Sequence, residues 1–556
     1  MAYERTFTYS CTEISMSLDS NYILLMLSTA APLLLWAMGL FGNMVAGAHA
    51  QRIARLSSIV SGLAFLCAVL ASLLYAVRGI PLVITSYSLA LPGNMGAIGL
   101  SIYINTVTVM MLCLVSFVGF VVARYARNYL QGETHQGRFY TWLNLTLASI
   151  LTLIVSGNML MFVLVWMTTS LSLHHLLMFY PEREGAILAA RKKIIASRLG
   201  ELSLLIAVLL IGSTLHTMEF SALFPAMAAM TGPLPVSLLW ASLLIVVAAA
   251  LKSAQFPLHG WLMQVMEAPT PVSALLHAGI VNGGAFLIIR MSPIMSQATT
   301  ASNLLALIGL LTIAFAGLVM QTQTSLKVFL AWTTAAQMGF MLLECGLGLY
   351  SLAMLHLIAH SLYKAHAFLS SGSAVDHFRA PAMHPQHDMP TLGHWIIVLA
   401  FAGLMTTAIG TAFGITITVQ PALLASGIIV VVAMTQYLLQ SFKSGLGATF
   451  ILRAAALSAL VCTAYFSLHA AFHYMLATSL PTGRVSNDPV QFVLIGMTML
   501  VFFAILLIQQ NLPNLSRYPV ARKVYVHLYN GLYVDIPFTR LVQRLFPVIP
   551  NKGVKP

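Results

Sequence analysis

Residues 237–262 read SLLWASLLIVVAAALKSAQFPLHGWL, an apolar run that meets Lys252 and then, five residues later, Pro257. Proline has no backbone N–H to bond the carbonyl one turn earlier, so we expect the helix to end near Lys252 and Ser253. Broken helices at membrane depth occur where the backbone lines a cavity or binds ions. The stretch therefore predicts a membrane helix that is interrupted at a buried lysine.

The composition of the whole chain also indicates a membrane environment. Of its 556 residues, 59% are hydrophobic and 7% are charged, whereas a soluble domain has about 25% charged residues. So few charges could not cover a soluble protein of this size, and we expect an all-α polytopic membrane protein. The net charge of +13 comes from basic residues between apolar spans, which is typical of membrane topology and not of nucleic-acid binding.

The apolar segments define the expected helices. A spanning helix needs about 20 apolar residues, and by this measure the chain contains about fifteen candidates. The turn Ser156-Gly157-Asn158 divides one long apolar run into two of them. The candidates begin near residues 22, 57, 100, 141, 159, 187, 235, 270, 303, 326, 349, 392, 423, 454 and 490.

The lysines and arginines predict the orientation of these spans. If the N-terminus lies outside and the spans alternate, twenty of the 27 basic residues fall on the inner side, including the edge Arg191-Lys192-Lys193, and three fall within spans. The four left outside are Arg5, Arg78, Arg290 and Arg484. Since basic residues concentrate in cytoplasmic loops, we expect an outer N-terminus and a cytoplasmic C-terminus.

Ionisable side chains inside the spans are candidates for function, because each costs roughly 2.5–3.5 kcal/mol on the insertion scale. Glu201 enters an apolar helix, and a structural ion pair with Arg198 is the alternative explanation. Lys252 lies at the predicted break, where a lysine removed from water gives up its proton more readily. His277 lies inside the next span, where packing and proton relay are both open.

The most regular pattern is His356, His360 and Lys364, which are spaced i, i+4 and i+8. On a helix these positions drift by only about 80° and form one stripe. Two groups that titrate near neutrality, followed by a lysine, suit proton hopping. Metal binding by the two histidines is the alternative, but no carboxylate or thiolate lies on the stripe to complete a ligand set.

Other features give weaker indications of metal sites. The histidines of one inner loop could bind a metal together with Asp376 and Asp388, although a solvated polar loop is the better explanation; they are His377, His384, His387 and His394. The five cysteines are scattered without a CxxC motif, so they predict neither a disulfide framework nor a cluster.

The segment from about residue 512 is the sizeable polar part of the chain. Residues 522–529 and 538–545 read as short amphipathic helices with basic side chains. Such helices lie on anionic lipid or provide a docking surface for a cytoplasmic partner, and the sequence leaves both open.

Two motifs resemble the antiporter-like subunits of respiratory complex I and of Mrp sodium–proton antiporters. They are KSAQFPLHGWL followed by EAPTPVSALLHA, within 252–278, and HSLYKAHAFLSSGS at 360–373. The resemblance covers roughly residues 100–450. It implies an antiporter-like fold, in which two inverted five-helix repeats with broken helices each hold a half-channel, joined by a central chain of lysines, histidines and glutamates.

The resemblance also implies roles for individual residues. Lys252 matches the lysine of the broken helix, His277 the linking histidine, Lys364 the lysine of the second half and Glu201 an acid of the preceding helix. In the expected path Lys252 with Glu201 gates proton entry, and the stripe carries the proton onward. The predicted proton-pathway residues are therefore Glu201, Lys252, His277, His356, His360 and Lys364.

The chain departs from the family pattern at two places. The family's tryptophan–glutamate–glycine pattern here reads Trp166-Met167-Thr168, so the usual partner acid of the broken-helix lysine is absent. The stretch that matches the second broken helix, residues 406–414, carries no charge. A complete complex I pathway is therefore not implied.

One branch of the family fits better. Residues 264–269, QVMEAP, and 524–535, VYVHLYNGLYVD, are similar to DabB, the membrane subunits of bacterial DAB inorganic-carbon accumulation complexes. The resemblance implies a partner, DabA, which resembles a zinc β-carbonic anhydrase. This chain would then be a transporter subunit of the bacterial inner membrane, and not an enzyme. A proton or sodium gradient would drive hydration of CO2 in the partner, with zinc expected there and no cofactor here.

Two other functions stay open at this point. One is an antiporter-like subunit of a complex I-type redox complex or of a Mrp cation exchanger, and the other is a non-conducting scaffold for a cytoplasmic enzyme. In each case we expect four segments. They are N-terminal transmembrane helices at 1–99, an antiporter-like core at 100–450, C-terminal transmembrane helices at 451–511 and a cytoplasmic tail at 512–556.

Overall fold

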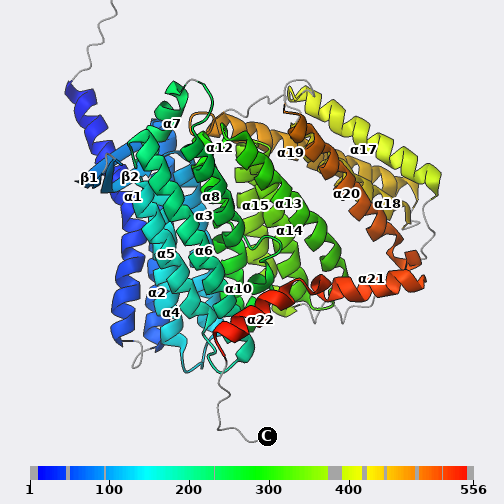
Figure 1. Ribbon diagram of the computed structural model, residues 1–556, viewed down its shortest axis with the longest axis horizontal. Coiled ribbons are helices and arrows are strands. Elements are labelled where there is room, and N and C mark those ends of the chain that lie inside the picture. Colours follow the sequence, from blue (N-terminus) through cyan, green and yellow to red (C-terminus); the bar gives the residue numbers. More distant parts are fainter. Residues whose placement is uncertain are drawn as a thin grey trace, which may run out of the picture. The chain divides into compact units, whose positions relative to one another are not determined.

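A computed structural model describes residues 11–45, 50–92, 95–230, 232–373, 391–415, 422–443, 447–481, 488–515 and 517–547. The chain forms two compact units. Unit 1 comprises Met1–Phe179 and Ile211–Met230, and unit 2 comprises Tyr180–Leu210 and Thr231–Pro556. Helices dominate both units (Figure 1), which confirms the predicted helical class. The predicted division into four segments and the inverted repeats stay predictions.

Unit 1 consists of helices and one β-hairpin. The helix α6, Glu184–Leu215, begins in unit 2 and ends in unit 1. The other elements are α1 (Cys11–Val45), α2 (Ala50–Arg78), β1 (Leu82–Ala90), β2 (Ala97–Ile104), α3 (Thr106–Tyr129), α4 (Gln136–Val155), α5 (Met159–Leu177) and α7 (Phe220–Ala229).

Unit 2 contains the remaining elements. Those that surround the interrupted helix are α8 (Val236–Lys252), α9 (Gly260–Met263), α10 (Thr270–Leu275), the π-helix η3 (Leu276–Ile280), α11 (Gly283–Arg290) and α12 (Ser292–Met295). The later elements are α13 (Thr299–Val319), α14 (Leu326–Gly346), α15 (Tyr350–Leu369), α17 (Leu392–Ala412), α18 (Ala422–Lys443), α19 (Ala448–Leu476), α20 (Pro489–Leu515), α21 (Pro519–Tyr529) and α22 (Asp535–Leu545).

The predicted spans coincide with helices of the described chain. Twelve of these helices are long and apolar enough to cross a membrane. Two further spans correspond to the shorter apolar helices Val236–Lys252 and Ser426–Phe442, and one corresponds to α15, which contains several histidines and a lysine. The total of about fifteen spans stays a prediction, because length and composition alone support twelve.

At the expected start of one helix, the structure has a β-strand instead. The helix expected near residue 100 begins at Thr106, because the residues before it form β2, which pairs antiparallel with β1 from Leu82 opposite Ile104 onward. Asn105 accepts a hydrogen bond from the N–H of Thr108 at 3.0 Å and thereby caps the helix. An apolar run alone does not distinguish a strand from the first turns of a membrane helix.

The turn at residues 156–158 was predicted correctly. Helix α4 ends at Val155 and α5 begins at Met159. The side chain of Asn158 accepts hydrogen bonds from the N–H groups of Leu160 and Met161 at 3.0 and 3.3 Å. These bonds satisfy backbone donors that would otherwise be unpaired at the start of α5.

The interruption after Lys252 is confirmed. Helix α8 ends at Lys252, and Ala254 takes the left-handed conformation, with φ of 49°. The N–H of Gln255 donates to the carbonyl of Ala250 at 3.1 Å. A bond of this span across a left-handed residue is typical of a Schellman helix end, where glycine is the usual residue. The break is therefore held by the backbone as well as by Pro257.

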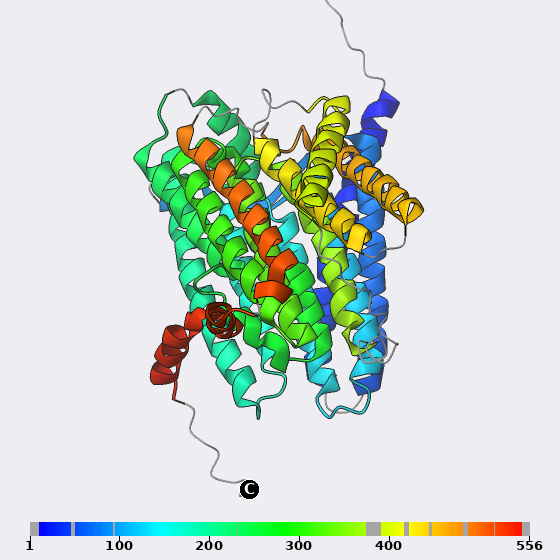
Figure 2. The ribbon, with the colours of Figure 1, turned by 90° about the vertical axis from the view of Figure 1, so that its right-hand side faces the viewer.

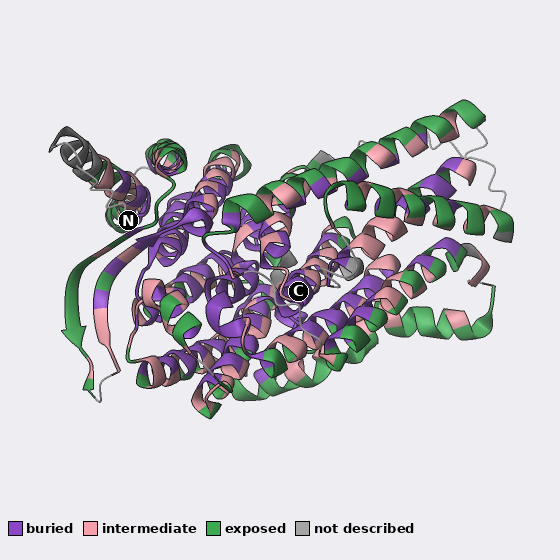
Figure 3. Ribbon diagram, turned by 90° about the horizontal axis from the view of Figure 1, so that it is seen from above, coloured by how far each residue is buried: buried purple, intermediate pink, exposed green. Residues whose placement is uncertain are grey.

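Close helix contacts in unit 2 depend on glycines. Helix α13 packs along α14, and α20 lies along α13 (Figure 2). A Cβ atom on Gly339 would lie 2.7 Å from the carbonyl oxygen of Gly309, and one on Gly309 would lie 2.7 Å from the N of Leu343. Buried residues gather where the helices face one another, and exposed residues face outward (Figure 3). The two glycines therefore set the distance between α13 and α14.

We expect Gly309→Val to lower the free energy of unfolding by about 1–3 kcal/mol or more, because the added carbons overlap the backbone of α14. Gly403→Val is the matched control, since a Cβ on this helical glycine would meet nothing within 4 Å. The melting temperatures of both variants are measured in detergent, with size-exclusion chromatography after heating to detect the protein that remains folded. Equal melting temperatures for the two variants would contradict the role of Gly309.

Candidate functional site

The first cluster of charges centres on Lys252, which is half-buried at the end of α8. The charge of the Glu201 carboxylate, on α6, acts on the ammonium groups of both Lys252 and Lys193. Lys193 and Glu201 are eight residues apart on one helix, so they share a face two turns apart. Both are buried. The structure thus brings Glu201 and Lys252 together, as expected, and adds Lys193.

Glu201 also forms the ion pair that the sequence left as an alternative. Nη1 of Arg198 lies 2.9 Å from Oε2 of Glu201, and the Arg198 side chain is 41% exposed while that of Glu201 is 1% exposed. Arg198 therefore reaches Glu201 from the surface of the helix. Because the charge of Glu201 also acts on Lys193 and Lys252, the ion pair and the buried cluster exist together.

The second cluster lies on α15. Nδ1 of His356 is 3.0 Å from Oε2 of Glu344, and its Nε2 is 2.6 Å from Oε1 of Gln337. Both partners come from α14. His360 lies one turn further and is within electrostatic reach of His356 and of Lys364. The predicted stripe therefore exists, and α14 supplies it with a buried carboxylate.

Lys364 ends the stripe inside the protein. Its ammonium group donates to the carbonyl oxygen of Leu330 at 3.1 Å and to the hydroxyl of Thr333. The side chain is 1% exposed. Both acceptors are neutral, so the ammonium group has dipoles but no carboxylate in its hydrogen-bond shell among the described residues.

His277 connects to this end of the stripe. It lies in the π-helix η3, an irregular turn of a kind frequent at functional sites. Its ring stacks on Phe368 with centroids 4.4 Å apart, and Lys364 and His360 lie within its electrostatic reach. The structure therefore brings His277, His360 and Lys364 together, as expected from a relay.

Short polar side chains lie between the two clusters. The hydroxyl of Ser253, next to Lys252, donates to the carbonyl of Val281 at 2.8 Å. The following residue, Asn282, donates from its side chain to the hydroxyl of Ser361 at 2.7 Å, and Ser361 follows His360. All three polar side chains are buried. Hydrogen bonds of the turn between η3 and α11 thus connect the end of α8 to α15.

Several buried polar atoms along this line have no hydrogen-bond partner among the described residues. They are Oε1 of Gln255, Oδ1 of Asn282 and both ring nitrogens of His277 and of His360. Buried polar atoms are normally bonded to protein or to ordered water. A row of such atoms is therefore suited to holding a chain of water molecules.

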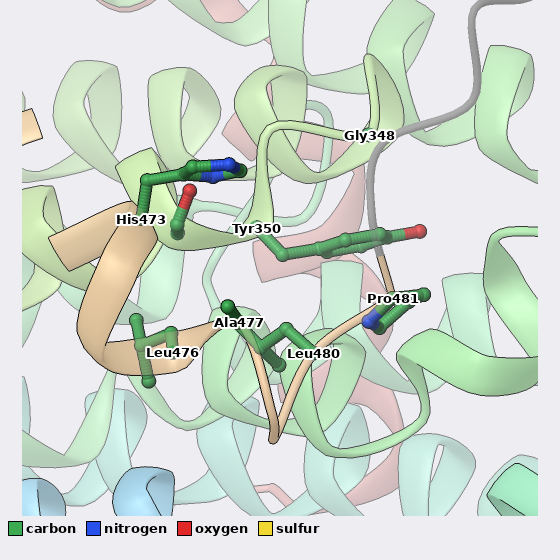
Figure 4. Close-up of a pocket in the computed structure, with 8 residues that line it drawn as sticks. Gly348, Tyr350, His473, Leu476, Ala477, Leu480 and Pro481 are labelled. Atoms are coloured by element: carbon green, nitrogen blue, oxygen red, sulfur yellow. The ribbon is translucent and has the colours of Figure 1, made fainter. Parts of the chain in front are cut away.

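The surface of unit 2 is hollowed at the end of α14 and the start of α15. Tyr350, the first residue of α15, lines one hollow together with His473 of α19 (Figure 4) and a neighbouring hollow with Gln491. The N–H of Leu349 donates to the carbonyl of Glu344 at 2.8 Å. These hollows therefore adjoin the end of α14 that holds the carboxylate bound to His356.

Sequence reasoning missed Lys193 and Glu344. Lys192 and Lys193 were counted with an inner loop, but α6 begins at Glu184 and encloses both, and both are buried. The two-turn spacing from Lys193 to Glu201 was the available signal. Glu344 lies inside the apolar span Leu326–Gly346, which is itself a signal of function, but its partner His356 is on another helix.

The metal alternatives find no support in the described part of the chain. No group of three or more histidine, cysteine, aspartate or glutamate side chains there could hold a metal ion. The proposed loop site lies outside the described residues, apart from His394 in α17. That this chain needs no cofactor stays a prediction.

The two departures from the family pattern lie in regular helices. Met167 lies within α5. The stretch 406–414 forms the end of α17 and the turn that follows, where Thr406 donates to the carbonyl of Ala402 at 2.8 Å.

The model of the NADH:quinone oxidoreductase/Mrp antiporter transmembrane family matches residues 156–442, and the model of the complex I chain 5 N-terminus matches residues 93–140. A "Probable inorganic carbon transporter subunit DabB2" of Halothiobacillus neapolitanus is 42% identical over 91% of this chain and 90% of its own length.

More distant relatives share part of the chain. The NADH-quinone oxidoreductase subunit L of Mycobacterium tuberculosis is 33% identical over 52% of this chain and 45% of its own length. The structure of the Mrp complex from Dietzia sp. DQ12-45-1b has a TM-score of 0.63 at 22% identity, covering 95% of this chain and 60% of that one. At this identity the likeness concerns the fold.

We expect Arg198→Ala to change stability by less than about 1 kcal/mol, because half-exposed ion pairs contribute little. Glu201→Gln should cost more, since Lys193 and Lys252 then lose the buried carboxylate that compensates them. Thermal unfolding of the two variants and of the double variant measures this. Equal losses of stability in all three variants would mean that Glu201 interacts only with Arg198.

Proposed function

Because the chain belongs to the NADH:quinone oxidoreductase/Mrp antiporter transmembrane family, in its DabB branch of inorganic carbon transporter subunits, we propose that it conducts protons for a complex that accumulates inorganic carbon. The observation that supports conduction most directly is the pair of buried charge clusters joined by Ser253, Asn282 and Ser361. Intramembrane ionisable groups of this kind mark ion pathways and proton relays.

The proposed path joins Glu344 to Glu201. A proton passes from the carboxylate of Glu344 to His356 and His360, then to His277 and Lys364. Water held by unpartnered polar atoms takes it on to Lys252 and Glu201. The sequence assigned entry to Lys252. The hollows beside Tyr350 instead favour entry at Glu344, at an end that the distribution of basic residues predicts to lie outside the cell.

Lysines in such a path act by gaining and losing charge. Lys364 is held by the Leu330 carbonyl and the Thr333 hydroxyl, which bind the ammonium form through neutral dipoles. Lys252 has Glu201 within electrostatic reach and Lys193 beside it. A proton that arrives at this cluster changes the balance between one carboxylate and two ammonium groups, and repulsion then favours its release.

We place the chemistry of CO2 in a partner protein. The relative from Halothiobacillus neapolitanus is named a transporter subunit, which supports this chain being one component of a multi-subunit complex. We propose a DabA-like zinc protein, resembling carbonic anhydrase, as the partner in a bacterial inner membrane. The chain then has its N-terminus outside and its C-terminus in the cytoplasm. Proton or sodium entry would make the hydration of CO2 to bicarbonate one-way.

The available energy is sufficient for this coupling. One charge that crosses about 150 mV releases about 3.5 kcal/mol, at about 2.3 kcal/mol per 100 mV. A tenfold concentration ratio corresponds to about 1.4 kcal/mol. One proton could therefore sustain a bicarbonate gradient of a few hundredfold.

A redox complex or a cation exchanger is the second candidate. The similarity to NADH-quinone oxidoreductase subunit L over half of the chain favours it. Purification of this chain from its native membrane distinguishes the two, because a zinc protein should accompany it in the first case and flavin or iron–sulfur subunits in the second. A non-conducting scaffold predicts carbon uptake that is insensitive to uncouplers.

We expect Lys252→Ala to abolish the ability of this chain, expressed with its DabA-like partner, to restore growth in air to a bacterium that lacks carbonic anhydrase. The alanine cannot accept the proton that reaches the interruption of α8. Arg453→Ala is the control, since Arg453 is an exposed cation at the start of α19 and should leave growth unchanged. Full rescue by Lys252→Ala would show that Lys252 has no part in conduction.

We expect Glu344→Gln to reduce uncoupler-sensitive bicarbonate accumulation by about tenfold or more, because the amide keeps the shape of the carboxylate but cannot carry the proton to His356. Glu344→Asp keeps the carboxylate and should retain part of the activity. Uptake of labelled inorganic carbon in intact cells measures both. If the glutamine variant were as active as the aspartate variant, the Glu344–His356 pair would be a packing feature.

A further inference from the structure

The tail of unit 2, from about residue 512, is attached by hydrogen bonds on both sides of the interruption after α8. Helices α21 and α22 lie at one end of the bundle of unit 2 (Figure 1). The hydroxyl of Tyr525 donates to the carbonyl of Thr322 at 3.2 Å, before the start of α14. Further along the chain, Arg191 of α6 donates to the carbonyl of Phe546 at 2.6 Å. The tail therefore spans from the segment between α13 and α14 to α6, and Asp535 lies between these two attachments.

Asp535 is a charged residue of the tail that contacts a buried side chain. Its Oδ2 lies 2.5 Å from Nζ of Lys192, whose side chain is fully buried while that of Asp535 is 29% exposed. Thr539 donates to the same oxygen at 3.1 Å. The carboxylate also covers Gly260, where a Cβ atom would overlap it. A glycine at this position is thus required for the close approach of the carboxylate to the start of α9.

A buried histidine lies beside this contact. His259 precedes Gly260 and is 2% exposed, with Asp535 and Lys192 within its electrostatic reach. Its ring packs against Trp332, with centroids 5.0 Å apart. Nδ1 of this ring has no hydrogen-bond partner among the described residues, and the same is true of Oδ1 of Asp535. A neutral packing histidine would not explain two unpartnered polar atoms from different elements at one place.

Further polar atoms lie between His259 and Lys252, in the segment that follows α8. Gln255, one turn before His259, donates from its side chain to the carbonyl of Ser253 at 2.8 Å. Its Oε1 is buried without a hydrogen-bond partner in the described chain. The segment that leaves α8 therefore presents polar atoms at Ser253, Gln255 and His259, and it ends under the Asp535 carboxylate.

We propose that Asp535 is the group through which the proton path exchanges protons with the solution on the side of the tail. His259 and Gln255 connect it to Lys252. This proposal rests on the proposed function, because it gives the conducted proton its exit. His259 protonated by the path transfers its proton to the buried, unpartnered oxygen of Asp535, and the carboxyl group, whose side chain is partly exposed, then releases a proton to water. His259 and Asp535 return to their starting charges.

The environment of Asp535 suits this exchange. Lys192 and Thr539 engage one carboxylate oxygen and leave the other without a partner in the described chain. The side chain is partly exposed, whereas His259 is buried behind it. Asp535 is therefore the titratable group that meets both the solution and the buried histidine. Tail attachment alone would need the ion pair with Lys192 but no buried histidine beside it.

The test measures proton flux through the full chain in its complex with the partner, in vesicles with the tail facing outward. A potassium gradient with valinomycin drives the flux, and a pH-sensitive dye inside reports it. We expect Asp535→Asn to lower the flux by about tenfold or more, and Asp535→Glu to keep part of it. Raising the concentration of impermeant MES outside should partly restore flux to the asparagine variant, because a mobile buffer replaces the lost proton acceptor.

Tyr525→Phe is the matched control, since it removes one tail attachment and leaves every group of the proposed exit in place. It should conduct like the parent protein. Equal loss of flux in Tyr525→Phe and Asp535→Asn, without an effect of MES, would show that the tail is only an anchor. Parental flux in Asp535→Asn would overturn the exit while conduction stands. If the parent complex conducts no protons, the proposed function fails and the exit fails with it.

Discussion

Ionised groups inside an apolar helix bundle have to be compensated by opposite charges or by hydrogen-bonding dipoles, because lipid and apolar side chains cannot solvate them. In this protein that constraint acts at the end of α8. Lys252 is brought to membrane depth by an apolar helix and meets Glu201 and Lys193 of α6. Lys193 and Glu201 lie two turns apart on one face of α6, so this face has to point toward the interruption.

The same constraint organises α14 and α15. The carboxylate of Glu344 and the side-chain oxygen of Gln337 bind the two ring nitrogens of His356, and the α14 backbone and Thr333 bind Lys364. Every charged or titratable group of the stripe except His360 has a hydrogen-bond partner from the neighbouring helix in the described chain. Helix α14 thus packs against α13 and also supplies the hydrogen-bond partners of His356 and Lys364 on α15.

Backbone irregularities make the connection between these clusters possible. A Cβ on Gly284 would lie 3.1 Å from the carbonyl carbon of Ala249, so α11 can approach α8 closely enough for Ser253 to reach the carbonyl of Val281. The π-helix at His277 supplies the second irregularity, before Asn282 reaches Ser361. The polar line therefore passes through positions where regular helix geometry is relaxed, as is common at functional sites.

By itself, the sequence determined the membrane class, the helical spans, the end of α8 at Lys252 and the stripe on α15. These follow from local properties, namely apolar run length, the missing N–H of Pro257 and helical spacing. Only the tertiary structure decided that Glu344 binds His356, that Lys193 of α6 lies within electrostatic reach of Lys252 of α8, and that Asp535 covers Gly260. Those pairs join residues on different helices or on opposite sides of a helix end, and spacing along one chain does not specify which helix faces meet.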